Sequence, residues 1–564
     1  MKNCKQCNNG FEITDGDRKF LKKVSPIIGG QTFDIPEPTL CPDCRRQRRL
    51  TFRNERSLYR RDCDLCNKSF ISIFPAGTPF PVYCSDCWWS DKWNPLEYGQ
   101  DLPAGRQGFD FSRSFAEQFH ELNMKVPKSG TLIYRCENCE YNSLQGLSRN
   151  TYMSPGSYQM EDCLYMRKGQ YCKDCVDCLI CDHCELVYES LNSKNCYNAN
   201  YLIQCNNVSD SEYMAYCDAC KHCFMCSDLR QKEYCIQNKQ YSKGEYESKI
   251  TELKKQSHSE LTKKFLEFAK TLPKRAATLV NTENCVGDRL YDCKNVFHAF
   301  DCFDCEDCRY VYDLAEGKDM MDVDILDKQN ELCYECGTGG DQNVRDLFCF
   351  CPVYSQDTMY CYCVWQCQNM FGCNSISKKF SYCILNKQYS KEEYEKLVPK
   401  IIEHMKSTGE WGEHMPASLS LHAYNESLAN DYFPLTKEEA LKKGFKWKTI
   451  EEKVSNVTKK IKASQLPDDI NAIPDEVLDC AIECEETGRL FRIQPQELKF
   501  YRKKSLPIPH VHPDARHHKR LHLQNPNKLY NRKCDKCQTD IQTTYAPERP
   551  ETVYCEACYL KEVY

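Results

Sequence analysis

Short apolar runs, interrupted by polar residues every few positions, fill the middle of this chain. Over residues 136–383, tyrosine, valine, asparagine and cysteine are frequent, proline is rare, and each apolar run soon meets Asn or Asp. Such runs with turn residues between them are typical of short β-strands. We therefore expect a mostly β fold here, a parallel β-solenoid in which short strands stack coil upon coil.

The middle of the chain is also duplicated. Residues 178–202 match residues 302–326 at an offset of 124, and YCIQNKQYSKGEYE (234–247) matches YCILNKQYSKEEYE (382–395) at an offset of 148. Between these matches the offset grows by about 23 residues, which predicts one additional coil in the second copy. The predicted segments are a first solenoid copy (130–247), a helical connector (248–284), a second solenoid copy (285–395) and a helical and irregular linker (396–478).

Three positions in these segments carry a pattern that starts helices. A serine or threonine followed three residues later by glutamate is a capping box. The pattern occurs at Ser242 and Glu245, at Ser390 and Glu393, and at Thr436 and Glu439. We expect the last of these helices to stop at Gly444.

Cysteine pairs with two residues between them mark both ends of the chain. Four such CxxC pairs lie in residues 4–87, and two more lie in residues 534–558. The two ends are copies of each other, because residues 41–87 align with residues 512–558 at an offset of 471. Two CxxC pairs supply the four thiolates of a closed, structural zinc site. We therefore expect duplicated modules of zinc-ribbon or treble-clef type at 1–98 and 479–564.

The eroded C-terminal copy indicates which pairs share a metal ion. There Thr487, His512 and Ala515 stand where the N-terminal copy has Cys7, Cys41 and Cys44. If the first pair shares an ion with the second and the third with the fourth, the C-terminal copy has lost one site and kept one intact. If instead the first pair shared with the third and the second with the fourth, both C-terminal sites would be half-built. We therefore predict about three Zn²⁺ sites, formed by Cys4, Cys7, Cys41 and Cys44, by Cys63, Cys66, Cys84 and Cys87, and by Cys534, Cys537, Cys555 and Cys558. Cys480, Cys484 and His512 either hold another ion in a degenerate site or only pack.

A strongly basic segment connects the two N-terminal sites. RRQRRLTFRNERSLYRR (45–61) holds eight arginines, which are Arg45, Arg46, Arg48, Arg49, Arg53, Arg56, Arg60 and Arg61. A helix that leaves a zinc knuckle would display these guanidinium groups to solvent, where their planar forks suit phosphate. RNA or a ribonucleoprotein is therefore one expected partner. Trp88, Trp89 and Trp93 would either stack on bases or form a small core lid over the zinc.

The distribution of charge supports a second interpretation of the basic segment. The net charge is +5 over residues 1–93, +7 over residues 488–564 and −17 between them. Basic ends around an acidic middle indicate either an anionic partner or contact between the ends and the middle. In the second case the arginines would be paired within the chain.

The central cysteines allow three interpretations. Residues 136–383 hold 29 of the 43 cysteines. Many follow a three-residue spacing, as in Cys172, Cys175, Cys178, Cys181 and Cys184, and in Cys217, Cys220, Cys223 and Cys226. They are inward-facing fillers of the solenoid, zinc ligands, or ligands of an iron–sulfur cluster. Met320 and Met370 replace cysteines of the first copy, which favours packing at those positions.

The motifs CPDCRRQRRL (41–50), YCSDCWWSDKW (83–93), YCILNKQYSKEEYE (382–395) and FPLTKEEALKKGFKW (433–447) resemble a family of uncharacterised, cysteine-rich zinc-ribbon proteins from candidate-phyla (Patescibacteria-type) bacteria. The likeness covers most of the chain. It implies a bacterial origin and zinc binding. It implies no activity, since none is established for that family.

No catalytic motif stands out in the sequence. We find no GxSxG, Walker A, helix-opening GxGxxG or HExxH pattern. Neither a signal peptide nor a transmembrane stretch is apparent, and thiol-rich CxxC spacing indicates a reducing, cytoplasmic setting. The leading hypothesis is a non-catalytic zinc-binding scaffold for RNA, a ribonucleoprotein or another protein, with no membrane contact and no small-molecule substrate identified. The alternatives are a redox or metal-handling protein and a structural protein–protein interaction solenoid.

Overall fold

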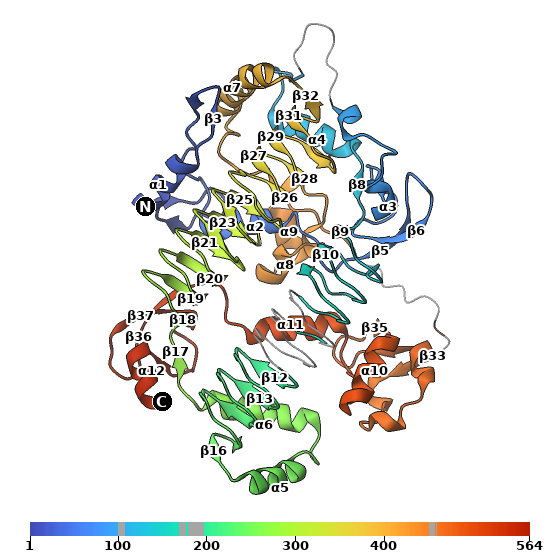
Figure 1. Ribbon diagram of the computed structural model, residues 1–564, viewed down its shortest axis with the longest axis vertical. Helices are drawn as coiled ribbons and strands as arrows, with labels where there is room; N and C mark the ends of the chain where they lie inside the picture. The colour runs from blue at the N-terminus through green and yellow to red at the C-terminus, as the bar shows by residue number, and fades with distance from the viewer. Residues whose placement is uncertain are drawn as a thin grey trace.

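Two stacks of short parallel strands form the body of the protein (Figure 1). The computed structural model describes residues 1–99, 108–167, 176–178, 197–326, 328–449, 457 and 459–563. Of the predicted cysteine run, Cys172, Cys175, Cys181 and Cys184 lie outside these residues. Modules from both ends of the chain pack on the stacks. The prediction of a mostly β fold with a parallel solenoid is confirmed.

The described strands of the first stack lie between residues 133 and 236, and those of the second stack lie between residues 279 and 384. The strands of the first stack are β9 (Ile133–Tyr134), β10 (Gln145–Gly146), β11 (Ser157–Tyr158), β12 (Asn200–Ile203), β13 (Glu212–Ala215), β14 (Phe224–Ser227) and β15 (Cys235–Ile236). The long sheet of the second stack consists of β18 (Leu279–Val280), β19 (Val286–Tyr291), β20 (Phe297–Phe303), β21 (Arg309–Tyr312), β23 (Met321–Asp324), β25 (Tyr334–Gly337), β26 (Phe350–Val353), β28 (Tyr362–Trp365) and β30 (Asn374–Ile376). The second stack also contains β22 (Gly317–Lys318), β24 (Asn330–Glu331), β27 (Gln356–Met359), β29 (Gln368–Phe371) and β31 (Ser381–Ile384), outside the long sheet.

Strand register fixes the length of a coil. Gln145 pairs in parallel with Ser157, and Glu212 pairs with Phe224, so most neighbouring coils are 12 residues apart; the spacing is 11 between β18 and β19 and 13 between β23 and β25. The predicted insertion of about 23 residues therefore corresponds to about two coils, and the prediction of one additional coil is wrong. The offset showed how much chain was inserted, but it did not show how many turns that chain makes.

A three-residue step explains the spacing of the central cysteines. Within a coil, every third residue has a positive φ, for example Tyr216, Ala219 and His222. The residue after most of these corners is buried, as are Cys217 and Cys220. Four steps of three residues complete a coil of 12. Asn and Asp are frequent at the corners because they tolerate the left-handed region better than most residues.

Antiparallel hairpins and helices close the stacks. β15 pairs with β16 (Lys239–Gln240) and β31 with β32 (Lys387–Gln388). Helices follow, namely α5 (Lys243–Leu253) and α6 (His258–Lys270) after the first stack, and α7 (Lys391–Thr408), α8 (Ala429–Tyr432) and α9 (Lys437–Lys442) after the second. The predicted capping boxes at the starts of α5, α7 and α9 are confirmed, and Gly444, just after α9, has a φ of 79°.

The two end modules share one order of elements. The N-terminal module has β1 (Lys2–Asn3), β2 (Gly10–Phe11), α1 (Asp15–Val24), β3 (Ile27–Ile28), β4 (Gln31–Thr32), α2 (Pro42–Leu50), β5 (Tyr59–Asp62), β6 (Ser69–Ser72), β7 (Val82–Tyr83) and α3 (Ser85–Trp88). The C-terminal module, which β33 (Lys459–Lys462) joins, has β34 (Cys480–Glu483), β35 (Leu490–Phe491), α10 (Pro495–Lys504), α11 (Pro513–Leu523), β36 (Tyr530–Lys533), β37 (Asp540–Thr543), β38 (Val553–Tyr554) and α12 (Glu556–Val563). Only β3 and β4 lack a counterpart among the described residues of the second module.

Candidate metal centres and arginine clamps

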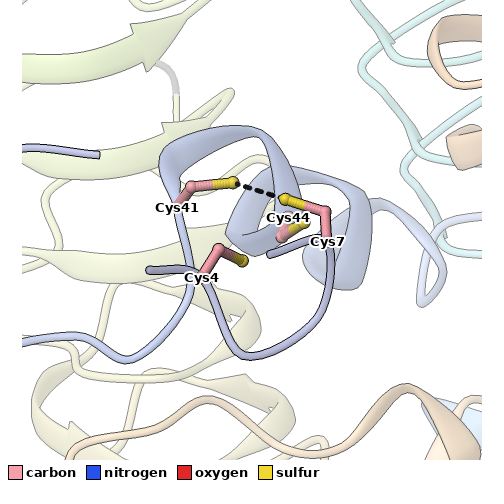
Figure 2. Close-up of side chains that lie close together, drawn as sticks. All are labelled: Cys4, Cys7, Cys41 and Cys44. Carbon is pink, nitrogen blue, oxygen red and sulfur yellow. Dashed lines mark hydrogen bonds between the residues drawn. The ribbon is translucent and has the colours of Figure 1, made fainter. Parts of the chain in front are cut away.

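The first cysteine cluster joins a hairpin to the start of a helix. Cys4 and Cys7 lie in the tight turn between β1 and β2, and Cys41 and Cys44 lie at the start of α2. Figure 2 shows the four thiols turned toward one another. The Cys7 and Cys41 sulfurs are 3.7 Å apart.

The other two clusters repeat this geometry. Cys63, Cys66, Cys84 and Cys87 form one, and Cys534, Cys537, Cys555 and Cys558 form the other. Sulfurs from the two pairs lie 3.8 Å apart in the first and 3.6 Å apart in the second. Four sulfurs at about 2.3 Å from one tetrahedral ion lie about 3.8 Å from one another. All three clusters therefore fit a metal ion, and the thiols group as sequential pairing predicts.

Backbone amides around the clusters favour thiolates. The amide of Cys84 donates to Cys63 Sγ at 3.2 Å, and in the C-terminal copy the amide of Cys555 donates to Cys534 Sγ at the same distance. The backbone N–H of Lys68 and the neighbouring thiols lower the pKa of Cys66 to about 7. Metal ions bind the thiolate. Each cluster thus offers four sulfur ligands to one metal ion.

In the degenerate first site of the C-terminal module, the polar atoms of Cys480, Cys484 and His512 make hydrogen bonds within the module. The Cys480 thiol donates to the carbonyl of Glu476 at 3.3 Å. Cys484 Sγ accepts from the backbone amide of His512, and His512 Nδ1 accepts from the amide of Asp514. Among the described residues, Cys480, Cys484 and His512 do not form a group that could hold a metal ion. This arrangement agrees with the packing interpretation.

Most central thiols of the described residues line the inside of the coils; Cys351 and Cys363, at corners, pack outward against the cluster shared with the N-terminal module. Cys217 Sγ donates to Ala215 O and Cys302 Sγ to Phe300 O, each to the carbonyl two residues before it. Burial raises the pKa of Cys367 to about 12 and that of Cys302 well above its usual value. Neutral thiols with carbonyl partners act as apolar fillers. In the described part of the stacks, no set of three cysteines is close enough to share a metal ion.

Helix α2 packs on the acidic face of the second stack. Arg45, Arg46, Arg48, Arg49, Arg53 and Arg61 are buried, so the expectation that the arginine segment faces solvent is wrong for these six. Arg45 meets Asp322 at 2.8 Å, and Arg49 meets Asp324 at 2.8 Å. Arg48 meets the buried carboxylate of Glu335 at 2.7 Å. Contact between the basic ends and the acidic middle explains the burial.

The C-terminal module repeats these contacts on the first stack. Arg516 and Arg520 of α11, which align with Arg45 and Arg49 at the offset of 471, meet buried Asp177 at 2.8 and 3.1 Å. Each helix also places an arginine over a tyrosine ring. Arg45 lies 5.6 Å from the centre of Tyr310, and Arg516 lies 5.2 Å from that of Tyr165. We call these two sets of arginines, with their carboxylates and tyrosines, the arginine clamps.

Each module also pairs one strand with the segment that leads into the stack that its clamp does not hold, in a separate two-stranded sheet. β7 of the N-terminal module pairs in parallel with β8 (Lys128–Ser129), which leads into the first stack. β38 of the C-terminal module pairs with β17 (Lys274–Arg275), which leads into the second stack. Both modules therefore contact both stacks and tie them together crosswise. Between the modules, Arg56 meets Asp514 at 2.8 Å.

The remaining residues of the predicted nucleic-acid surface have internal contacts. Arg53 pairs with Glu55 and Arg61 with Asp64. Arg60 is exposed and donates to the Tyr141 hydroxyl at 3.1 Å. The indole rings of Trp88 and Trp93 are buried beside the second cysteine cluster, and that of Trp89 is half-buried against Trp365 of the second stack. The tryptophans thus form a small core, as one of the two interpretations predicted.

Comparison with known proteins gave no match to a family model or to a curated protein. Within the described residues, no helix has the length and apolar character needed to cross a membrane. The three cysteine clusters and the two arginine clamps are the features of this protein that point to a function.

Proposed function

We propose that this protein is a zinc-stapled scaffold that joins two β-solenoids and presents their surfaces to another macromolecule. The crosswise connection carries the proposal, because each end module clamps one stack and pairs with the strand that leads into the other. A closed site of four thiolates stabilises a fold and leaves no position for catalysis. We propose that the ion is zinc and that the end modules are of zinc-ribbon or treble-clef type, because each cluster offers four thiols to one ion. The resemblance to bacterial zinc-ribbon proteins stays a prediction, as does a cytoplasmic setting.

A protein is favoured over RNA as the partner. The arginine segment that suggested RNA is largely buried, and Arg45, Arg48 and Arg49 already have carboxylate partners. A guanidinium that pairs with a buried carboxylate is not available to phosphate. Solenoids present extended, regular surfaces, and these commonly bind other proteins.

Elemental analysis of the purified full-length chain tests the metal part of the proposal. Three zinc ions per chain are expected, one for each cluster. Cys84→Ala should lower this number by one, because it opens the second cluster. Cys217→Ala is the matched control, since Cys217 is a buried filler thiol, and it should leave the zinc content unchanged. Bound iron with a visible absorbance band would refute the proposal in favour of a redox protein.

An RNA titration tests the choice of partner. A single-stranded RNA should bind weakly or not at all at physiological salt, and Arg60→Ala should not alter the result. Tight, salt-sensitive RNA binding that is lost in Arg60→Ala would contradict the preference for a protein partner.

A further inference from the structure

One CxxC pair of the first stack lies outside the three cysteine clusters, at the open end of the stack. Cys136 and Cys139 belong to the coil of β9, the edge strand of its sheet, so no preceding coil of the described residues covers them. Cys136 is half-buried and Cys139 is 4% exposed. Every other described pair with this spacing in the stacks is buried at both positions, as are Cys217 and Cys220. The first pair is therefore the one most open to a dissolved reagent.

The surroundings of Cys139 allow it to carry a negative charge. The hydroxyl of Thr151, one coil later, donates to Cys139 Sγ at 3.1 Å. The Cys136 thiol and this hydroxyl lower the pKa of Cys139 to about 6, and the thiolate so formed raises the pKa of Cys136. When Cys139 is protonated, its thiol can instead donate to the carbonyl of Glu137 at 3.1 Å. The two sulfurs therefore share one proton near neutral pH, and a thiolate is the reactive form in thiol–disulfide exchange.

The matching coil of the second stack lacks both features. At an offset of 146, it has ENC at 283–285 where the first stack has ENC at 137–139. Thr282 replaces the first cysteine of the pair, and Val296, one coil later, replaces the threonine donor. Cys285 is half-buried as well. It has neither a second thiol at this spacing before it nor the hydroxyl, so the chain contains its own control for the pair.

We propose that Cys136 and Cys139 form a reversible dithiol–disulfide site that reacts with low-molecular-weight disulfides. Cys136 Sγ attacks one sulfur of a disulfide RSSR while its proton passes to the Cys139 thiolate, and the first RS⁻ leaves. This RS⁻ takes the proton from Cys139, whose sulfur then attacks Cys136 Sγ and expels the second RS⁻. One cysteine disulfide, one RSH and one RS⁻ result, and two electrons have passed from the cysteine sulfurs to RSSR. The site is separate from the metal clusters and does not depend on the proposed scaffold role.

Tryptic mapping of the metal-loaded full chain tests the proposal. Cleavage after Arg135 and Arg149 gives a peptide, 136–149, whose only cysteines are Cys136 and Cys139. The protein is incubated with glutathione disulfide, alkylated with iodoacetamide and digested. The peptide should lose two hydrogen atoms and take up no alkyl group. Reduced glutathione should reverse this change, and the zinc content should stay constant throughout.

Two further peptides and one variant serve as controls. Cys285 is the only cysteine of peptide 276–289, so it can form no disulfide within its peptide. The buried pair of Cys217 and Cys220 should stay reduced over the time in which the first pair is oxidised. Thr151→Val keeps the shape of the side chain but removes the donor, so it should slow the oxidation severalfold.

Three results for the unchanged protein would overturn the proposal. The first is that peptide 136–149 keeps both thiols in glutathione disulfide. The second is that it is oxidised no faster than the buried pair of Cys217 and Cys220. The third is that glutathione stays attached to Cys136 and no disulfide to Cys139 follows. None of these results depends on how a variant folds.

Discussion

Replacing Arg49 by methionine removes one cation from the N-terminal arginine clamp. Arg49 is 2% exposed and meets Asp324 at 2.8 Å, with Asp322 and Glu335 each at 3.6 Å. Methionine has a similar unbranched stem but no charge. The variant would leave carboxylates buried with fewer cations around them. Breaking a buried pair in this way typically costs about 3–5 kcal/mol.

The assay is urea unfolding of the metal-loaded chain, followed by circular dichroism. Arg49→Met should lower the free energy of unfolding of the clamped region by about 3–5 kcal/mol. Arg520→Met makes the equivalent change in the C-terminal clamp, where Asp177 is the partner, and should act in the same direction. Arg60→Met is the matched control in the same segment. Because Arg60 is exposed, this variant should change the free energy by no more than about 0.5 kcal/mol.

A double variant separates the ion pair from simple loss of packing. Combining Arg49→Met with Asp324→Asn removes both charges, so the double variant should be more stable than the sum of the two single effects predicts. The interpretation would be refuted if Arg49→Met were as stable as Arg60→Met. That result would mean that α2 does not depend on its buried carboxylates.

Three further changes test other parts of the structure. Cys361→Ala, in the buried lining of the second stack, should leave the zinc content unchanged in elemental analysis; loss of an ion would show that the lining binds metal. Burial alone would raise the pKa of Asp431, but the imidazoles of His517, 3.5 Å away, and of His518, 3.4 Å away, hold it well below the usual 3.8. Its stabilising effect is therefore fully present above that value and is lost progressively as pH falls from it towards the much lower folded pKa. Asp431→Asn should destabilise the protein near pH 7 in urea unfolding, and its effect should begin to shrink only below about pH 4; an effect that is already lost at pH 5 would contradict this. Ser390→Ala removes the hydroxyl that accepts from the amide of Glu393 at 3.2 Å and should cost about 1 kcal/mol in the same assay, whereas Ser407→Ala, near the end of the same helix, should cost less.

The sequence predicted the elements that depend on local spacing. The CxxC pairs and the capping boxes each lie within a short stretch of chain. The grouping of the cysteines follows from comparing the N-terminal module with its eroded C-terminal copy. The three-residue spacing of the central cysteines was visible, but its cause was not. Positive φ values at Tyr216, Ala219 and His222 create the corners. Tyrosine, alanine and histidine do not by themselves predict a positive φ.

The partners of the arginines could not be found from local patterns. Arg45 meets Asp322, which is 277 residues away in the chain. The charge distribution indicated that the ends and the middle could pair, yet a helix with so many arginines looks solvent-exposed by its own composition. Only the fold brings Asp322, Asp324 and Glu335 to one face. The alignment of Arg45 and Arg49 with Arg516 and Arg520 was a usable signal, because it marks the arginines that both modules retain.

Amide hydrogen exchange in the two clamp helices is the most direct test of the scaffold. In the metal-loaded protein, the amides of α2 and α11 should exchange slowly, because both helices are held against the stacks by buried ion pairs. Removal of metal by a chelator should speed exchange in α2, whose start carries Cys41 and Cys44, and in the paired strands β7 and β38, which adjoin the other two clusters. Fast exchange of α2 in the metal-loaded protein, like that of an exposed surface helix, would contradict the account.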